Sequence, residues 1–128
     1  MRLLLDTHAF FWWFSGNSRL SLPARQAIAD DGNDVMVSAA SAWEIATKHR
    51  IGKLPDADAL ALDMTGAIAG QDFEELAITV EDAARAGSLP GSLRDPFARM
   101  LIAQALAHDL VLISMETLFD RYGVRRLW

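Results

Sequence analysis

The stretch Arg2-Leu3-Leu4-Leu5-Asp6-Thr7-His8 sets the pattern from which the fold can be predicted. A short apolar run that ends directly in an acid is typical of a buried strand that stops at a polar edge. The residues that follow, 7–14, fit a helix, and the Gly-Asn-Ser run at 16–18 ends it. A strand that gives way at once to a helix is the first half of a βαβ unit.

The rest of the chain repeats this alternation. Further strands are predicted at 34–38, 76–79, 110–113 and 124–128. Helices are predicted between them at 22–30, 41–50, 57–69, 81–86, 95–108 and 116–122. We therefore expect an α/β fold, a single domain over residues 1–128 with a central, mainly parallel sheet and helices on both faces.

The composition narrows the class of protein. The 128 residues carry 12 Lys and Arg against 17 Asp and Glu, a formal net charge of −5. This balance excludes a protein that holds nucleic acid by bulk charge, but not an enzyme that meets nucleic acid through a local patch and a metal. The absence of cysteine excludes disulfides, thiolate zinc sites and a Cys nucleophile. No run resembles a membrane span or a signal peptide, so we expect a soluble, cytoplasmic protein without membrane contact.

Four acids follow strands or open helices at what should be one edge of the sheet. Asp6 and Glu116 lie just past predicted strands, whereas Glu44 and Asp95 lie in the first turns of predicted helices. Each has a purely structural explanation as a helix cap or first-turn acid, including a capping box from Ser41 to Glu44. Gathered together, they would repel one another unless a hard cation such as Mg²⁺ or Mn²⁺ neutralised them. The chemistry implied is metal-assisted phosphodiester hydrolysis, with these acids as catalytic and metal-binding residues.

Several segments resemble PIN-domain nucleases, and more narrowly the VapC-type toxins of bacterial type II toxin–antitoxin modules. The resemblance covers essentially the whole chain and rests on segments 3–8 (LLLDTH), 38–44 (SAASAWE), 94–97 (RDPF), 100–105 (MLIAQA) and 119–128 (FDRYGVRRLW). It implies a parallel-sheet PIN fold and a Mg²⁺- or Mn²⁺-dependent endoribonuclease that cleaves RNA. It also implies a VapB-like antitoxin that blocks the site, with homodimers and toxin–antitoxin hetero-oligomers.

A match of the acids to the family pattern, one by one, reveals a departure. Asp6 and Glu44 match the first two metal-binding acids, and Glu116 stands where an Asp is usual. The family helix usually begins Asp-Pro-Phe-Asp-Arg, whereas residues 95–99 read DPFAR, so the acid expected at Ala98 is missing and only Asp95 lies on a similar face. This gap should weaken the metal site. Ala98 is either the natural residue of a low-activity variant or a substitution that silences a toxic enzyme. The intact pattern around it favours the second.

Other polar residues near these acids allow two interpretations each. Thr7 and Ser114 could order a metal-bound water or the phosphate, but we favour a role as caps of the following helices. Arg99 could pair with an acid of the site. A basic cluster could follow an RNA backbone or lie at a solvated helix end; its members are Lys48, Arg50 and Lys53.

Five consecutive aromatic residues at 10–14 cannot all face one core from a helix. Some of them should therefore meet solvent, a second subunit or a partner. Stacking on RNA bases is the alternative, but the family resemblance favours a protein partner. The residues predicted for this interface are Phe11, Trp12 and Trp13.

Two other classes of function compete with a nuclease. A module that keeps the PIN shape but only binds RNA or antitoxin would account for the gap at Ala98. A phosphotransfer domain that uses Asp6 as acceptor is weaker, because no second acid follows two residues on and no Gly-rich phosphate loop follows a strand.

Overall fold

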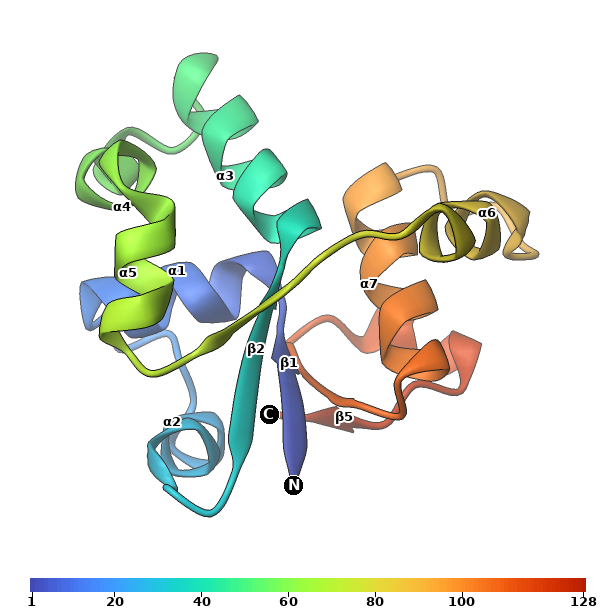
Figure 1. Cartoon of the computed structure of the whole chain (residues 1–128), viewed down its shortest axis with the longest axis horizontal. Coiled ribbons are helices and arrows are strands. Elements are labelled where there is room, and N and C mark those ends of the chain that lie inside the picture. The colour runs from blue at the N-terminus through green and yellow to red at the C-terminus, as the bar shows by residue number, and fades with distance from the viewer.

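The computed structural model covers every residue from Met1 to Trp128 and contains one five-stranded sheet (Figure 1). The strands are β1 (Arg2–Leu5), β2 (Asp34–Ser38), β3 (Glu74–Leu76), β4 (Val111–Ile113) and β5 (Arg126–Leu127). They lie in the order β3-β2-β1-β4-β5, and every neighbouring pair is parallel. The predicted parallel α/β sheet is confirmed, and its first strand is its central one.

Helices cover both faces of this sheet, as predicted. They are α1 (Thr7–Ser15), α2 (Leu22–Ala29), α3 (Ala39–Arg50), α4 (Asp58–Leu62), α5 (Met64–Gly70), α6 (Val80–Ser88) and α7 (Pro96–Ala107), with 3-10 helices at η1 (Pro55–Ala57) and η2 (Thr117–Tyr122). Helices α1 to α5 contribute to one core, and α7 with η2 to the other. In Figure 1 these two groups stand on opposite sides of β1 and β2. None of the helices has the length and apolar character needed to cross a membrane.

The leucines of β1 show how both faces are filled. Leu3, Leu4 and Leu5 are all fully buried. Because successive side chains of a strand point to opposite faces, Leu3 and Leu5 join the first core while Leu4 joins the second. An uninterrupted apolar run is therefore the expected sequence of a strand that is covered on both sides.

Helix α3 begins earlier than predicted. Its N-cap is Ser38, whose hydroxyl accepts from the Ala40 N–H at 3.0 Å. The capping box predicted from Ser41 to Glu44 is therefore wrong: both residues lie inside the helix, and both are buried. This one-turn shift moves Glu44 from a helix end to the interior of the molecule.

Three other element boundaries differ from the prediction. The helix expected over 57–69 is divided into η1, α4 and α5, because Asp63 leaves helical geometry and its carboxylate accepts from the Gly66 N–H at 3.0 Å. The strand expected at 76–79 lies earlier, as β3, and the residues after it lead into α6. The last predicted strand shortens to two residues in β5.

Helix α1 is covered on more sides than its sequence suggests. Phe11 and Trp12 are buried, so the prediction that they form an exposed partner interface is wrong. The reason is tertiary: Trp128 packs against Trp12 with ring centroids 6.0 Å apart, and Phe73 packs against Trp13 at 6.2 Å. Trp13 is half-buried, and its place in a partner interface stays a prediction.

Candidate acidic site at the carboxyl ends of the strands

The four acids line one pocket of about 240 Å³. Asp6 directly follows β1, and Glu116 lies past β4, which is hydrogen-bonded to β1. Glu44 comes from α3, which follows β2, and Asp95 caps the start of α7. Because parallel strands end at the same edge of the sheet, residues distant in sequence meet there. The structure thus brings the four predicted acids together, and their catalytic roles stay predictions.

Asp6 is the most deeply placed of these acids, with 5% of its surface exposed. One carboxylate oxygen, Oδ1, accepts from the Ala9 N–H at 2.8 Å, which caps α1. Burial raises the pKa of Asp6 above its ordinary value, and the nearby charge of Glu116 adds to the rise. The Ser114 hydroxyl, the Ala9 N–H and His8 favour the charged form but do not offset the burial. Asp6 is therefore a carboxylate whose negative charge the protein leaves partly uncompensated.

Both carboxylate oxygens of Glu44 have partners. Thr7 Oγ1 donates to Oε1 at 2.5 Å, and Lys48 Nζ donates to Oε2 at 2.5 Å. The capping role favoured for Thr7 is wrong, because its hydroxyl is directed at Glu44 and lies 3.2 Å from Ser41 Oγ. Lys48 lies in the last turn of α3 and lines the pocket, where its ammonium pairs with Glu44. Together these contacts hold Glu44, which is 7% exposed, in one orientation.

The other two acids are more open to solvent. Asp95 accepts from the first free N–H groups of α7 through Oδ1, as predicted for an N-cap. Glu116 is exposed, and its own N–H donates to Ser114 Oγ at 3.0 Å. The helix cap predicted for Ser114 is wrong, because the N-cap of η2 is Glu116 and no side chain caps that helix; the fully buried Ser114 instead connects the Glu116 loop to Asp6.

Positions 98 and 99 face different surroundings. Ala98 lines the acidic pocket and packs against the second core. The Arg99 guanidinium instead donates to four carbonyls of the segment before α7, at 2.9 Å to Ala86, 3.4 Å to Gly87, 2.6 Å to Leu89 and 2.7 Å to Leu93. The predicted pairing of Arg99 with a site acid is therefore wrong, because the backbone takes its donors. Through these bonds, Arg99 holds the loop between α6 and α7 in place.

The remaining basic candidates lie outside this pocket. Lys53 lines an adjoining pocket that shares His8 with the acidic one. Arg50 is exposed at the end of α3 and lines neither pocket. No site role is predicted for His8 from the sequence, although its position directly after Asp6 and Thr7 is a usable signal.

The donor set of the acidic pocket suits a hard cation. Its ligand atoms are carboxylate and hydroxyl oxygens, the type that Mg²⁺ and Mn²⁺ prefer. As the side chains lie, no three of the acids and histidines stand close enough to share one ion. Ala98 marks a place in the lining where an additional carboxylate would bring the acids nearer to a full set of ligands.

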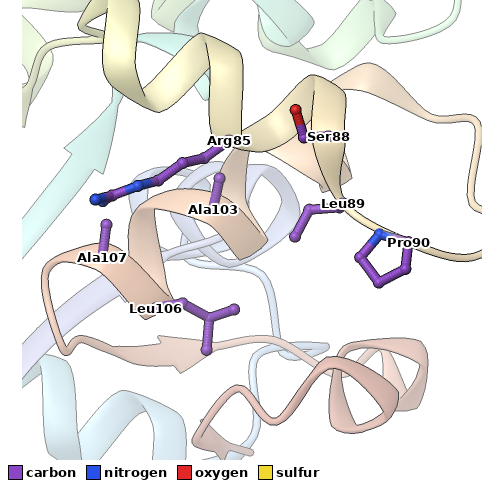
Figure 2. Close-up of a pocket in the computed structure, with 7 residues that line it drawn as sticks. All are labelled: Arg85, Ser88, Leu89, Pro90, Ala103, Leu106 and Ala107. Atoms are coloured by element: carbon purple, nitrogen blue, oxygen red, sulfur yellow. The ribbon is translucent and has the colours of Figure 1, made fainter.

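A wider pocket of about 570 Å³ lies between α6 and α7 and is drawn in Figure 2. Its lining is mostly small or apolar, and it contains no carboxylate and no histidine. Arg85, its one charged residue, pairs with Glu81 at 2.7 Å. Of these two pockets, only the acidic one therefore contains carboxylates and a histidine that could bind a metal or act in catalysis.

Comparisons with known proteins agree with this geometry. The PIN domain family model matches residues 3–124. Ribonuclease VapC22 of Mycobacterium tuberculosis is 31% identical over 117 residues, which are 89% of this chain and 86% of that protein.

Solved structures share the fold. VapBC2 from Rickettsia felis, solved with a DNA fragment from its promoter, aligns with a TM-score of 0.72 at 14% identity, over 99% of this chain and 98% of that chain. A toxin–antitoxin complex from Klebsiella pneumoniae aligns with a TM-score of 0.60 at 24% identity, over 90% and 87%. From the family match and the VapC22 relative, the chain belongs to the PIN-domain family and is a VapC-type member of it.

Proposed function

We propose that this chain is a Mg²⁺- or Mn²⁺-dependent endoribonuclease and the toxin of a VapBC-type toxin–antitoxin pair. The observation that carries the proposal is the pocket in which four acids gather around the buried, undercompensated Asp6 carboxylate. The PIN family match and the ribonuclease relative support RNA cleavage as the reaction.

The acids of the pocket and the residues that contact them have distinct roles in this proposal. The acids that hold the cation are Asp6, Glu44, Asp95 and Glu116. When bound, the cation would polarise the phosphodiester and activate a water. Thr7 fixes the orientation of Glu44, and Ser114 orients Asp6. Lys48 balances the charge of Glu44 and is close enough to the pocket to meet a substrate phosphate.

The substitution Ala98→Asp tests the proposal directly. It supplies the missing acid on the pocket lining, so Mg²⁺- or Mn²⁺-dependent cleavage of labelled RNA should rise by about tenfold or more. Ala98→Asn is the matched control, because it adds nearly the same volume without a negative charge.

The outcomes separate the two remaining classes of function. An equal gain for Asp and Asn, or no gain for either, would count against position 98 as a place for a metal-binding acid. If neither the native chain nor Ala98→Asp cleaves RNA while both bind it, the chain is the non-cleaving module that the gap at Ala98 also allows.

An antitoxin partner is supported by an apolar groove of about 220 Å³ among α3, α6 and α7. Trp43 is 60% exposed at its rim, and its ring lies 4.8 Å from that of Phe97. An exposed Trp beside an apolar groove is typical of a protein interface. We propose that the VapB-like antitoxin covers this groove and that the toxin forms homodimers. Trp43→Ser should weaken antitoxin binding, and sedimentation of the free chain tests the dimer.

A further inference from the structure

A second pocket adjoins the acidic one. Its volume is about 370 Å³, and His8 lines both. We call it the cationic pocket; its polar lining consists of His8, Ser15, Asn17, Arg19, Lys53 and Asp56. Because His8 is the second residue of α1 and directly follows the site residues Asp6 and Thr7, the start of α1 separates the two pockets.

The cations of this pocket are free of acidic partners. The ion pairs of the molecule involve neither Arg19 nor Lys53. Asp56 is the one acid in the lining. In a chain with a net charge of −5, two unpaired cations beside the acidic pocket form a local positive patch.

The backbone at both positions is held by hydrogen bonds, and the Arg19 side chain also packs on an aromatic ring. The Arg19 guanidinium lies 6.0 Å from the centre of the Trp12 ring, and the Arg19 N–H donates to Asn17 Oδ1 at 2.9 Å. The Lys53 N–H donates to the carbonyl of Lys48 at 2.8 Å. Lys53 is therefore attached to the turn of α3 whose own lysine reaches Glu44.

We propose that the cationic pocket binds an RNA phosphate adjacent to the one that is cleaved, so that the strand crosses His8 between the two pockets. This inference rests on the proposed ribonuclease function and specifies where its substrate lies. Arg and Lys are the usual ligands of nucleic-acid phosphates. Base stacking is not available here, because Trp12 is only 7% exposed beneath Arg19. The same burial leaves no open aromatic surface for a protein partner.

The test measures RNA binding without cleavage. The native chain is titrated, in EDTA, into a fluorescein-labelled single-stranded RNA of about 12 nucleotides and mixed sequence, at several salt concentrations. Arg19→Gln and Lys53→Gln should each weaken binding by roughly threefold to tenfold at low salt. Each should also lower the slope of log affinity against log salt by about 0.7, the value for one phosphate contact on a single strand.

Two controls make this result specific. Arg85→Gln removes the same charge from α6, beside the unrelated pocket of Figure 2, and should leave affinity and slope unchanged. Arg19→Lys keeps the charge and should retain the native slope. Gln variants that behave like Arg85→Gln, or a native chain that does not bind the RNA, would overturn the proposal. So would a loss of antitoxin binding with RNA binding unaffected.

The nuclease proposal and the cationic-pocket proposal are tested independently of each other. If Ala98→Asp cleaves RNA but Arg19 and Lys53 have no effect on the slope, the nuclease stands and the cationic pocket is not its subsite. If the slopes fall as expected but Ala98→Asp does not cleave, the pocket binds RNA in a protein that is not a nuclease.

Discussion

Asp6 and Asp82 are carboxylates with nearly equal solvent exposure and opposite pKa shifts. Their exposed fractions are 5% and 3%. Burial pushes the pKa of each upward, yet the pKa of Asp6 ends above the ordinary value and that of Asp82 below it. The difference has two causes: Asp6 lies much deeper in the molecule than Asp82, and the groups around Asp82 favour its charged form enough to offset burial.

Asp82 has a full set of donors. Gln104 Nε2 lies 3.1 Å from Oδ2, the Thr79 N–H lies 3.3 Å from the same oxygen, and His108 Nε2 lies 3.5 Å from Oδ1. Gln104 is itself fully buried and accepts from Ser38 Oγ at 2.5 Å. Through Gln104 of α7, the Asp82 carboxylate of α6 is thus linked to Ser38, the N-cap residue of α3.

Asp6 is surrounded differently. Its hydrogen bonds are fewer than its burial requires, and Glu116 adds a second negative charge nearby. A buried carboxylate with enough donors stabilises a fold, whereas one with surplus charge in a pocket is prepared for a cation. Substitutions at the two positions should consequently have opposite effects on stability.

The largest effect is expected for Asp82→Ala. It leaves a donor of the buried Gln104 amide and the partly buried Thr79 N–H without their acceptor, so the free energy of unfolding at pH 7 should fall by about 3 kcal/mol in urea denaturation. Asp31→Ala, at an exposed acid without an ion pair, is the control and should change the free energy by less than about 0.5 kcal/mol. A loss for Asp82→Ala as small as the control would mean that the network does not stabilise the fold.

The contribution of Asp82 should depend on pH in a defined direction. Since its folded pKa lies below the unfolded value of 3.8, its stabilisation is fully present above 3.8 and is lost as the pH falls through the folded pKa. Urea denaturation of the native chain and of Asp82→Ala should therefore give curves that converge in strong acid. Curves that stay parallel there would contradict the assigned direction of the pKa.

Asp6→Asn should have a smaller effect of the opposite sign. Asn still caps α1 but removes the uncompensated charge, so the free energy of unfolding at pH 7 should rise by about 1 kcal/mol. Because the folded pKa of Asp6 is raised, this gain should shrink as the pH falls through that pKa towards 3.8. In the Ala98→Asp background the same change should abolish RNA cleavage. A clear loss of stability would show that Asp6 belongs with Asp82 as a structural acid.

The smallest effect concerns Lys48, which occupies one oxygen of Glu44. Lys48→Met removes a positive charge from the pocket, so Mn²⁺ should bind about threefold more tightly, a change of about 0.6 kcal/mol. Lys53→Met, outside the acidic pocket, should alter Mn²⁺ binding less. Weaker Mn²⁺ binding in Lys48→Met would mean that the lysine supports the ion and does not compete with it.

The features predicted from the sequence are those set by local contacts. The caps at Asp6 and Asp95 join residues two or three positions apart, and the β1 leucines report burial on both faces. The partners of Glu44 and Gln104 could not be predicted in this way, because Thr7 and Asp82 lie 37 and 22 positions away.

Tertiary contacts also explain the wrong predictions. The partner interface predicted at Phe11 and Trp12 is wrong because these residues are buried, and Trp128, which packs against Trp12, comes from a distant part of the chain. Gln104 did carry a usable signal: a single amide in the apolar run MLIAQALA of 100–107 indicates a buried polar contact.

The central place of β1 has a consequence for how the protein is made. Leu3 pairs with Val35 on one side and with Val111 on the other. During synthesis on the ribosome, β1 therefore emerges first and keeps one edge open until β4 follows near the end of the chain. Asp6 and Glu116 meet only at that stage, so an incomplete copy of the chain lacks the acidic pocket. In a cell that makes this protein, the proposed nuclease activity would therefore come only from molecules in which both acids are in place.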